Sequence, residues 1–167
     1  MNFTRGDQVV HHSFGVGRVV SIEGRNFTGN RPRLFYRVEF PKTTIWVPVG
    51  NPPSRGLRPI TPKSQLNHFR DLLTSLPESL SVDVRIRHEE LEDRSGEGTF
   101  EALCQIVRDL GAWNQKKPLN NFEKTLLKRS RASLVEEWSF TSGLAVNETI
   151  EEIDSYLQKG KQSLTVD

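Results

Sequence analysis

Hydrophobic and polar side chains alternate along the first third of the chain, which is the pattern of half-buried strands. The clearest alternation runs from residue 14 to 23 and contains Gly15 and Gly17 near its start, and similar short runs occupy 7–12, 34–40 and 44–49. Turn-forming Gly, Pro and Asn separate these runs. Short strands separated by turns predict a small antiparallel barrel or a strongly bent sheet. Pro48 has no backbone N–H, so we expect it at a strand end or a sheet edge.

From Thr61 onward the apolar residues recur every three or four positions, which predicts helices. Five helices are expected, at about 61–76, 79–94, 99–117, 120–138 and from 147 onward. Thr61 would cap the first of them with Pro62 at its first helical position. Trp138 is in phase with Leu134, so we expect it in the core. The predicted fold class is α+β, a small β-barrel followed by an all-helical part.

The segment from Gly50 to Gly56 contains two prolines and two glycines, which disfavour regular structure, so we expect it to be the linker between the two parts. The change of periodicity falls just after it. We therefore expect two domains, residues 1–60 and 61–167, that fold separately.

Composition narrows the function classes. Hydrophobic residues are 35% of the 167 residues, and no run approaches the roughly 20 apolar residues of a membrane helix. The one cysteine, Cys104, and four histidines without ligand spacing predict no metal site and no cofactor. No nucleophile, base and oxyanion donors group together, so we expect no catalytic residues and no enzyme. The expected protein is cytoplasmic, without a leader or a membrane partner.

Charge is unevenly distributed although the net charge is only +2. Residues 1–60 carry nine basic and three acidic side chains, whereas residues 136–167 carry two and seven. This asymmetry predicts two surfaces with different partners. Lys124, Lys128 and Arg131 are spaced by four and three residues and share one helix face. That face is either simply solvated or contacts nucleic-acid phosphates.

Several short motifs, in the same order and spacing, resemble the bacterial CarD/CdnL family. In the first part they are Gly6-Asp7, Val9-Val10-His11, Gly15-Val16-Gly17-Arg18-Val19, Ile22-Glu23, Tyr36-Arg37-Val38, Val47-Pro48-Val49 and Gly56-Leu57-Arg58. In the helical part they are Ile106-Val107-Arg108-Asp109-Leu110, Leu119, Glu123-Lys124, Leu126-Leu127, Arg131, Leu134 and Glu137. The resemblance covers roughly residues 3–158.

The resemblance implies a transcription regulator that catalyses no reaction. Its Tudor/SH3-like N-terminal domain would bind the β subunit of RNA polymerase by extending a sheet. Its helical domain would touch promoter DNA without sequence specificity and stabilise the open complex. We expect a monomer that associates with the nucleoid through RNA polymerase.

Matching positions supply the candidate residues. Arg25, with Phe27 close by, and Trp46 take the polymerase-contacting positions. In the helical domain the resemblance points to DNA contact by Val84, Arg85, Arg87 and His88, joined by Lys124, Lys128 and Arg131.

One departure changes the expected DNA contact. Relatives usually carry a tryptophan wedge where Val84 stands and a basic residue where Glu89 stands. Valine offers less stacking surface than an indole, and Glu89 repels phosphate, so the wedge contact is weakened or altered. The alternative is a polymerase-bound adaptor whose helical domain binds another protein.

Overall fold

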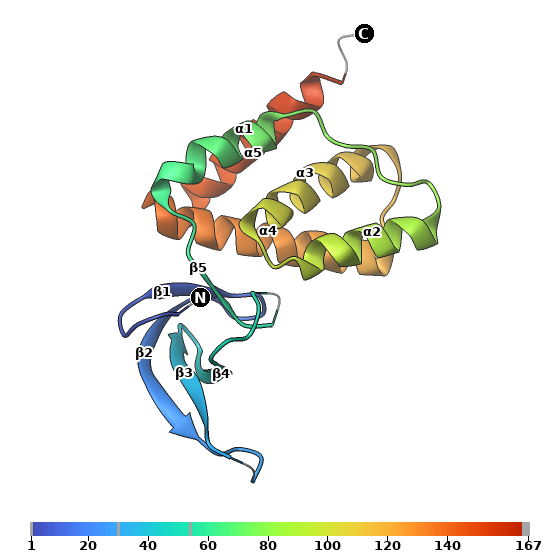
Figure 1. The fold of residues 1–167 in the computed structure, drawn as a ribbon. Helices are drawn as coiled ribbons and strands as arrows, with labels where there is room; N and C mark the ends of the chain where they lie inside the picture. Colours follow the sequence, from blue (N-terminus) through green and yellow to red (C-terminus); the bar gives the residue numbers. More distant parts are fainter. Residues whose placement is uncertain (1, 30, 54, 165–167) are drawn as a thin grey trace. The chain divides into compact units, whose positions relative to one another are not determined.

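The computed structural model describes residues 2–29, 31–53 and 55–164. Clustering of contacts divides the chain into two units, Met1–Ile60 and Thr61–Asp167. Unit 1 contains all the strands and unit 2 all the helices that the described residues form (Figure 1). The expected α+β class is confirmed.

Unit 1 is one antiparallel sheet with the strand order β4-β3-β2-β1-β5. The strands are β1 (Gln8–His11), β2 (Gly15–Arg25), β3 (Arg33–Phe40), β4 (Thr43–Pro48) and β5 (Leu57–Pro59). Gly15 has a φ of 78°, and at Gly17 a Cβ would lie 2.6 Å from the Phe40 ring, so both turn and pairing require glycine here. A bulge between Val19 and Ser21 accompanies the curvature of β2 (Figure 1).

The sheet is not closed into a barrel, which corrects the predicted detail. β4 and β5 are the two edges, and each ends in a proline that cannot donate to a further strand. Pro48 therefore lies where the sequence placed it, at the end of an edge strand.

The segment from Gly50 to Gly56 is not a linker between the units. It connects β4 to β5 inside unit 1, because Leu57 pairs with His11 and is buried. Strand β5 has only three residues, too few to show an alternating pattern.

One face of the sheet forms the core of unit 1. Because alternate residues of a strand point to opposite faces, this leaves an outer face that carries polar and aromatic side chains. The core is formed by Phe3, Val9, Val19, Tyr36, Val38, Phe40, Val47 and Leu57.

Unit 2 contains a short 3₁₀ turn, η1 (Lys63–Gln65), and five helices. These are α1 (Leu66–Thr74), α2 (Val84–Gly96), α3 (Phe100–Lys116), α4 (Asn121–Ser142) and α5 (Val146–Gln162). Helix α3 contacts α1, α2 and α4, and α5 packs on α1 and α4 (Figure 1). Trp138 is buried in a core shared by α1, α3, α4 and α5, as its spacing predicts, and Cys104 lies in the same core.

Two predicted helix starts are wrong. Thr61 does not cap the first helix; its N–H and hydroxyl both donate to Glu137, and the helical turns begin after Pro62. The second helix begins at Val84 rather than Ser79, because Asp83 accepts hydrogen bonds from the N–H groups of Arg85 and Ile86.

Candidate functional site

The outer face of the sheet brings together the three residues that sequence matching singled out there. The guanidinium carbon of Arg25 lies 4.6 Å from the centroid of the Trp46 ring and 5.9 Å from that of Phe27. The rings of Phe27 and Trp46 are 6.3 Å apart. We call Arg25, Phe27 and Trp46 the sheet cluster. It joins residues 21 positions apart through the pairing of β2, β3 and β4.

Glu23 holds this cluster in place. Its carboxylate accepts hydrogen bonds from Ser21 Oγ at 2.8 Å, Arg25 Nε at 2.9 Å and Trp46 Nε1 at 3.1 Å. The hydrogen bonds from Ser21, Trp46 and Arg25 lower the pKa of Glu23 to about 2. The carboxylate is therefore ionised throughout the physiological pH range.

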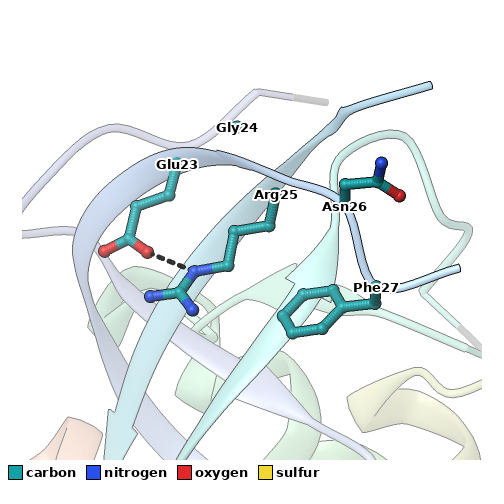
Figure 2. A pocket seen from close by; sticks show the side chains of 5 residues that line it. All are labelled: Glu23, Gly24, Arg25, Asn26 and Phe27. Atoms are coloured by element: carbon teal, nitrogen blue, oxygen red, sulfur yellow. Dashed lines mark hydrogen bonds and ion pairs between the residues drawn. The ribbon is translucent and has the colours of Figure 1, made fainter. Parts of the chain in front are cut away.

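The cluster is accessible and borders a sheet edge. Figure 2 shows the Arg25 guanidinium between the Glu23 carboxylate and the Phe27 ring, along an open hollow that residues 23–27 line. Phe27 is 57% exposed. Trp46 belongs to β4, which pairs with β3 on one side and with no other strand of the described chain. A cation and two aromatic rings beside a free edge suit recognition of another protein.

Sequence reasoning missed Glu23 and Phe35 as parts of this arrangement. Phe35 pairs with Glu23 across β2 and β3 and packs edge-on against Phe27 at 5.0 Å. The signal for Glu23 was present, since Ser21, Glu23 and Arg25 alternate along one strand and must share a face. The partner of Phe27 depends on strand register, which the pattern alone does not specify.

In unit 2, the four predicted DNA-contacting residues of α2 do not form one surface. Val84 is 58% exposed at the start of the helix, and Arg85 is exposed beside it. The His88 ring packs on Phe122 at 4.0 Å, and its Nε2 lies 3.3 Å from a carboxylate oxygen of Glu92. These side chains therefore have different neighbours and different access to solvent.

Arg87 is a correction. It is only 6% exposed, and its Nε donates to Glu123 Oε1 at 2.5 Å. Glu123 is itself buried and completes the capping box of α4 with Asn120. The guanidinium also lies 4.6 Å from the centroid of the Trp113 ring. Because Arg87 is committed to these internal contacts, it is a structural residue rather than a phosphate contact.

The three basic side chains predicted to share one face of α4, Lys124, Lys128 and Arg131, differ in their contacts. Lys124 and Lys128 are exposed. Arg131 instead donates to Asp154 of α5 at 2.5 Å. The cations of this face that are available to a phosphate are thus the two lysines.

The described residues offer neither a metal site nor a membrane-spanning helix. No cluster of three or more His, Cys, Asp or Glu side chains lies close enough together to hold a metal ion. None of the helices in the described part of the chain is both long and apolar enough to cross a bilayer.

Comparison with protein families decides the relationship. The CarD-like/TRCF RID domain matches residues 3–61, and the CarD C-terminal domain matches residues 69–154. The chain belongs to the CarD family. Its sheet cluster lies in the part that matches the RID domain, and α2 and α4 lie in the part that matches the CarD C-terminal domain.

A relative supports the same class. The protein named "Putative transcription factor YdeB" of Bacillus subtilis (strain 168) is 24% identical over 143 residues, which are 85% of this chain and 94% of the relative. CarD-like proteins are non-enzymatic regulators that interact with RNA polymerase. The chain therefore has a role in transcription regulation.

Proposed function

We propose that this protein binds the β subunit of RNA polymerase through unit 1 and modulates open-complex formation at promoters. One observation carries the proposal: Arg25, Phe27 and Trp46 converge on the outer face beside the free edge of β4. Family membership supports RNA polymerase as the partner, and this geometry supports the outer face of the sheet as the surface that binds it.

The docking mode follows from the sheet. A strand of the partner would add to β4, so that backbone hydrogen bonds set its direction and side chains on the outer face set its position. Glu23 already orients Arg25 and Trp46 before binding, and side chains that are held in place lose less entropy on association. Aromatic and arginine side chains are also the residue types that contribute most to binding at protein interfaces.

Contact with promoter DNA is proposed for Lys124 and Lys128 of α4. Lysine contacts with phosphates position a protein on DNA without reading its sequence. The wedge contact of α2 is weak in this proposal, because Val84 presents a small side chain and Arg87 is buried.

A second candidate function is a polymerase-bound adaptor whose helical unit binds another protein. The burial of Arg87 favours it, since α2 thereby loses one of the cations through which it would hold DNA. Both candidates share the polymerase interface of unit 1 and differ only in the partner of unit 2.

Charge reversal at Arg25 tests the polymerase interface that both candidate functions share. Arg25→Glu should greatly reduce the amount of RNA polymerase that co-purifies with the full chain, because it replaces the cation of the cluster by a charge that Glu23 repels. Arg5→Glu, an exposed reversal in the turn before β1, is the matched control and should retain polymerase. Equal polymerase recovery with both variants would contradict the proposal.

A further inference from the structure

A hollow of about 190 Å³ reaches the core of unit 1, away from the sheet cluster. Its floor consists of four core side chains, and its rim belongs to the end of β4 and to the segment that connects β4 to β5. The floor is formed by Phe3, Tyr36, Val47 and Leu57, and the rim by Pro48, Gly50, Asn51, Pro52 and Pro53. We call this feature the core hollow.

The core hollow exists because the sheet does not close. Val47 and Leu57 belong to β4 and β5, the two ends of the strand order. The segment between these strands makes its own hydrogen bonds instead of filling the gap. The Arg55 N–H donates to the carbonyl of Pro52 at 2.9 Å, and Asn51 Nδ2 donates to the carbonyl of Arg55 at 3.3 Å. The rim is therefore held in shape without a ligand.

The lining and the volume define the kind of group that fits. None of the nine lining residues carries a charge, and the rings of Phe3 and Tyr36 meet edge-on at 5.6 Å. An ionised group would lose its hydration here without gaining an ion pair. An apolar cavity of about 150 Å³ binds benzene, whereas sites for drug-sized molecules measure about 300–1,000 Å³. The core hollow therefore fits one compact, neutral ring.

The Tyr36 hydroxyl adds a polar requirement. Tyr36 is only 3% exposed, and its Oη accepts a hydrogen bond from the Phe3 N–H at 3.1 Å. The hydroxyl proton has no acceptor within hydrogen-bond distance among the residues that the structure describes. Both residues that meet at this hydroxyl line the core hollow. A ligand oxygen that accepted the proton would satisfy a donor that is otherwise buried without a partner, which costs free energy.

We propose that the core hollow binds a compact, neutral ring that carries one carbonyl oxygen, and that Tyr36 Oη donates to this oxygen. A small cyclic ketone and a proline residue of a peptide both present this chemistry. The site is separate from the sheet cluster, because Val47 and Trp46 are neighbours in β4 and point to opposite faces. The proposal thus goes beyond polymerase binding and does not depend on it.

Titrations of the full chain, followed by amide-resolved NMR, test the site with two defined probes. Cyclopentanone supplies the ring and the acceptor, and methylenecyclopentane is the same ring with carbon in place of the oxygen. Both should saturably shift the backbone amides of the floor residues. Tyr36→Phe should weaken cyclopentanone binding about fivefold, the effect of one hydrogen bond, and change the binding of methylenecyclopentane less than about twofold.

A second variant and two controls make the test independent of that substitution. Val47→Leu enlarges a floor side chain and should weaken both probes at least about threefold, because it reduces the free volume. Tyr156→Phe removes the hydroxyl of the other tyrosine, in α5, and should leave both affinities within about twofold. Arg25→Glu should do the same, so failure of the polymerase interface is distinguishable. Circular dichroism checks that each variant is folded.

A peptide probe distinguishes the two sources of the ligand. If N-acetylproline methylamide binds at least as tightly as cyclopentanone, the site receives a proline of a protein partner; if it binds more weakly, the site receives a free small molecule. The proposal is overturned if cyclopentanone gives no saturable shift at the floor amides. Equal losses of the two probes in Tyr36→Phe, or unchanged binding of both in Val47→Leu, would also overturn it.

Discussion

In both units of the molecule an arginine contacts a glutamate and a tryptophan. In unit 1, Arg25 pairs with Glu23 and lies 4.6 Å from the centroid of the Trp46 ring. In unit 2, Arg87 pairs with Glu123 and lies 4.6 Å from the centroid of the Trp113 ring. The arginine side chain is 43% exposed in the first trio and 7% exposed in the second.

This difference in exposure determines how much each arginine contributes to stability. An exposed ion pair contributes about 0–1 kcal/mol to stability, so Arg25 is available to a partner at little cost to the fold. Removing one member of a buried pair costs about 3–5 kcal/mol, because the other charge stays buried without a partner. Similar arginine contacts therefore stabilise the fold in unit 2, whereas in unit 1 they leave Arg25 accessible for the binding that we propose.

The largest expected effect is at the buried pair Arg87 and Glu123. Arg87→Ala should lower the free energy of unfolding of the helical unit by about 3–5 kcal/mol, since it leaves Glu123 buried and unpaired. Arg85→Ala, two positions away and exposed, should change it by less than about 0.5 kcal/mol. Urea unfolding followed by far-ultraviolet circular dichroism measures both, and similar midpoints for the two variants would refute the burial of Arg87.

Substitutions among Glu23, Arg25 and Trp46 should change the affinity for RNA polymerase rather than the stability of unit 1. Trp46→Ala should weaken the affinity for RNA polymerase by about 30-fold, which corresponds to a loss of about 2 kcal/mol. Trp113→Ala is the matched change beside Arg87 and should leave the polymerase affinity of the folded protein unaltered. Biolayer interferometry with immobilised polymerase compares them, and a larger loss for Trp113→Ala would reverse the assignment.

A smaller effect is expected on the basic face of α4. Lys124→Glu with Lys128→Glu should make the salt dependence of DNA binding shallower by about 1.8 in the logarithmic slope, because each phosphate contact contributes about 0.9. Lys63→Glu with Lys159→Glu changes two exposed lysines of other segments and serves as control. Unchanged slopes in the first variant would remove α4 from the DNA interface.

The smallest effect is expected at the wedge position. Val84→Trp should change the lifetime of heparin-challenged open complexes less than twofold. The reason is that the exposed acids Glu89, Glu90 and Glu92 of the same helix repel phosphates. Val84→Ala is the size control. A lifetime several times longer with tryptophan would show that α2 faces DNA after all.

The sequence predicted the sheet cluster better than α2, for a physical reason. The family motifs supplied Arg25 and Trp46, and alternation along β2 places Glu23 on the face of Arg25 whatever the register, although the approach of Trp46 depends on the pairing of β2, β3 and β4. In α2 the buried side is decided by contacts with α3 and α4. Either Ile86 or Leu91 could have faced the core, and the choice of Leu91 carries Arg87 inward with it.

Other features depended on contacts that a linear pattern does not contain. Strand β5 is specified by its pairing with β1, and the start of the first helix is shifted by the bonds of Thr61 to Glu137. The capping of α4 by Asn120 was predictable, because the signal and its partner Glu123 are three residues apart.

Photo-crosslinking from Phe27 tests the central claim most directly. A benzoylphenylalanine in place of Phe27 retains an aromatic ring at an exposed position of the sheet cluster. In complexes of the full chain with RNA polymerase and promoter DNA, irradiation should join it to the β subunit, and Arg25→Glu should abolish the product. Crosslinking to DNA or to another subunit, or no product above that from a probe at Arg5, would contradict the proposed role of this face.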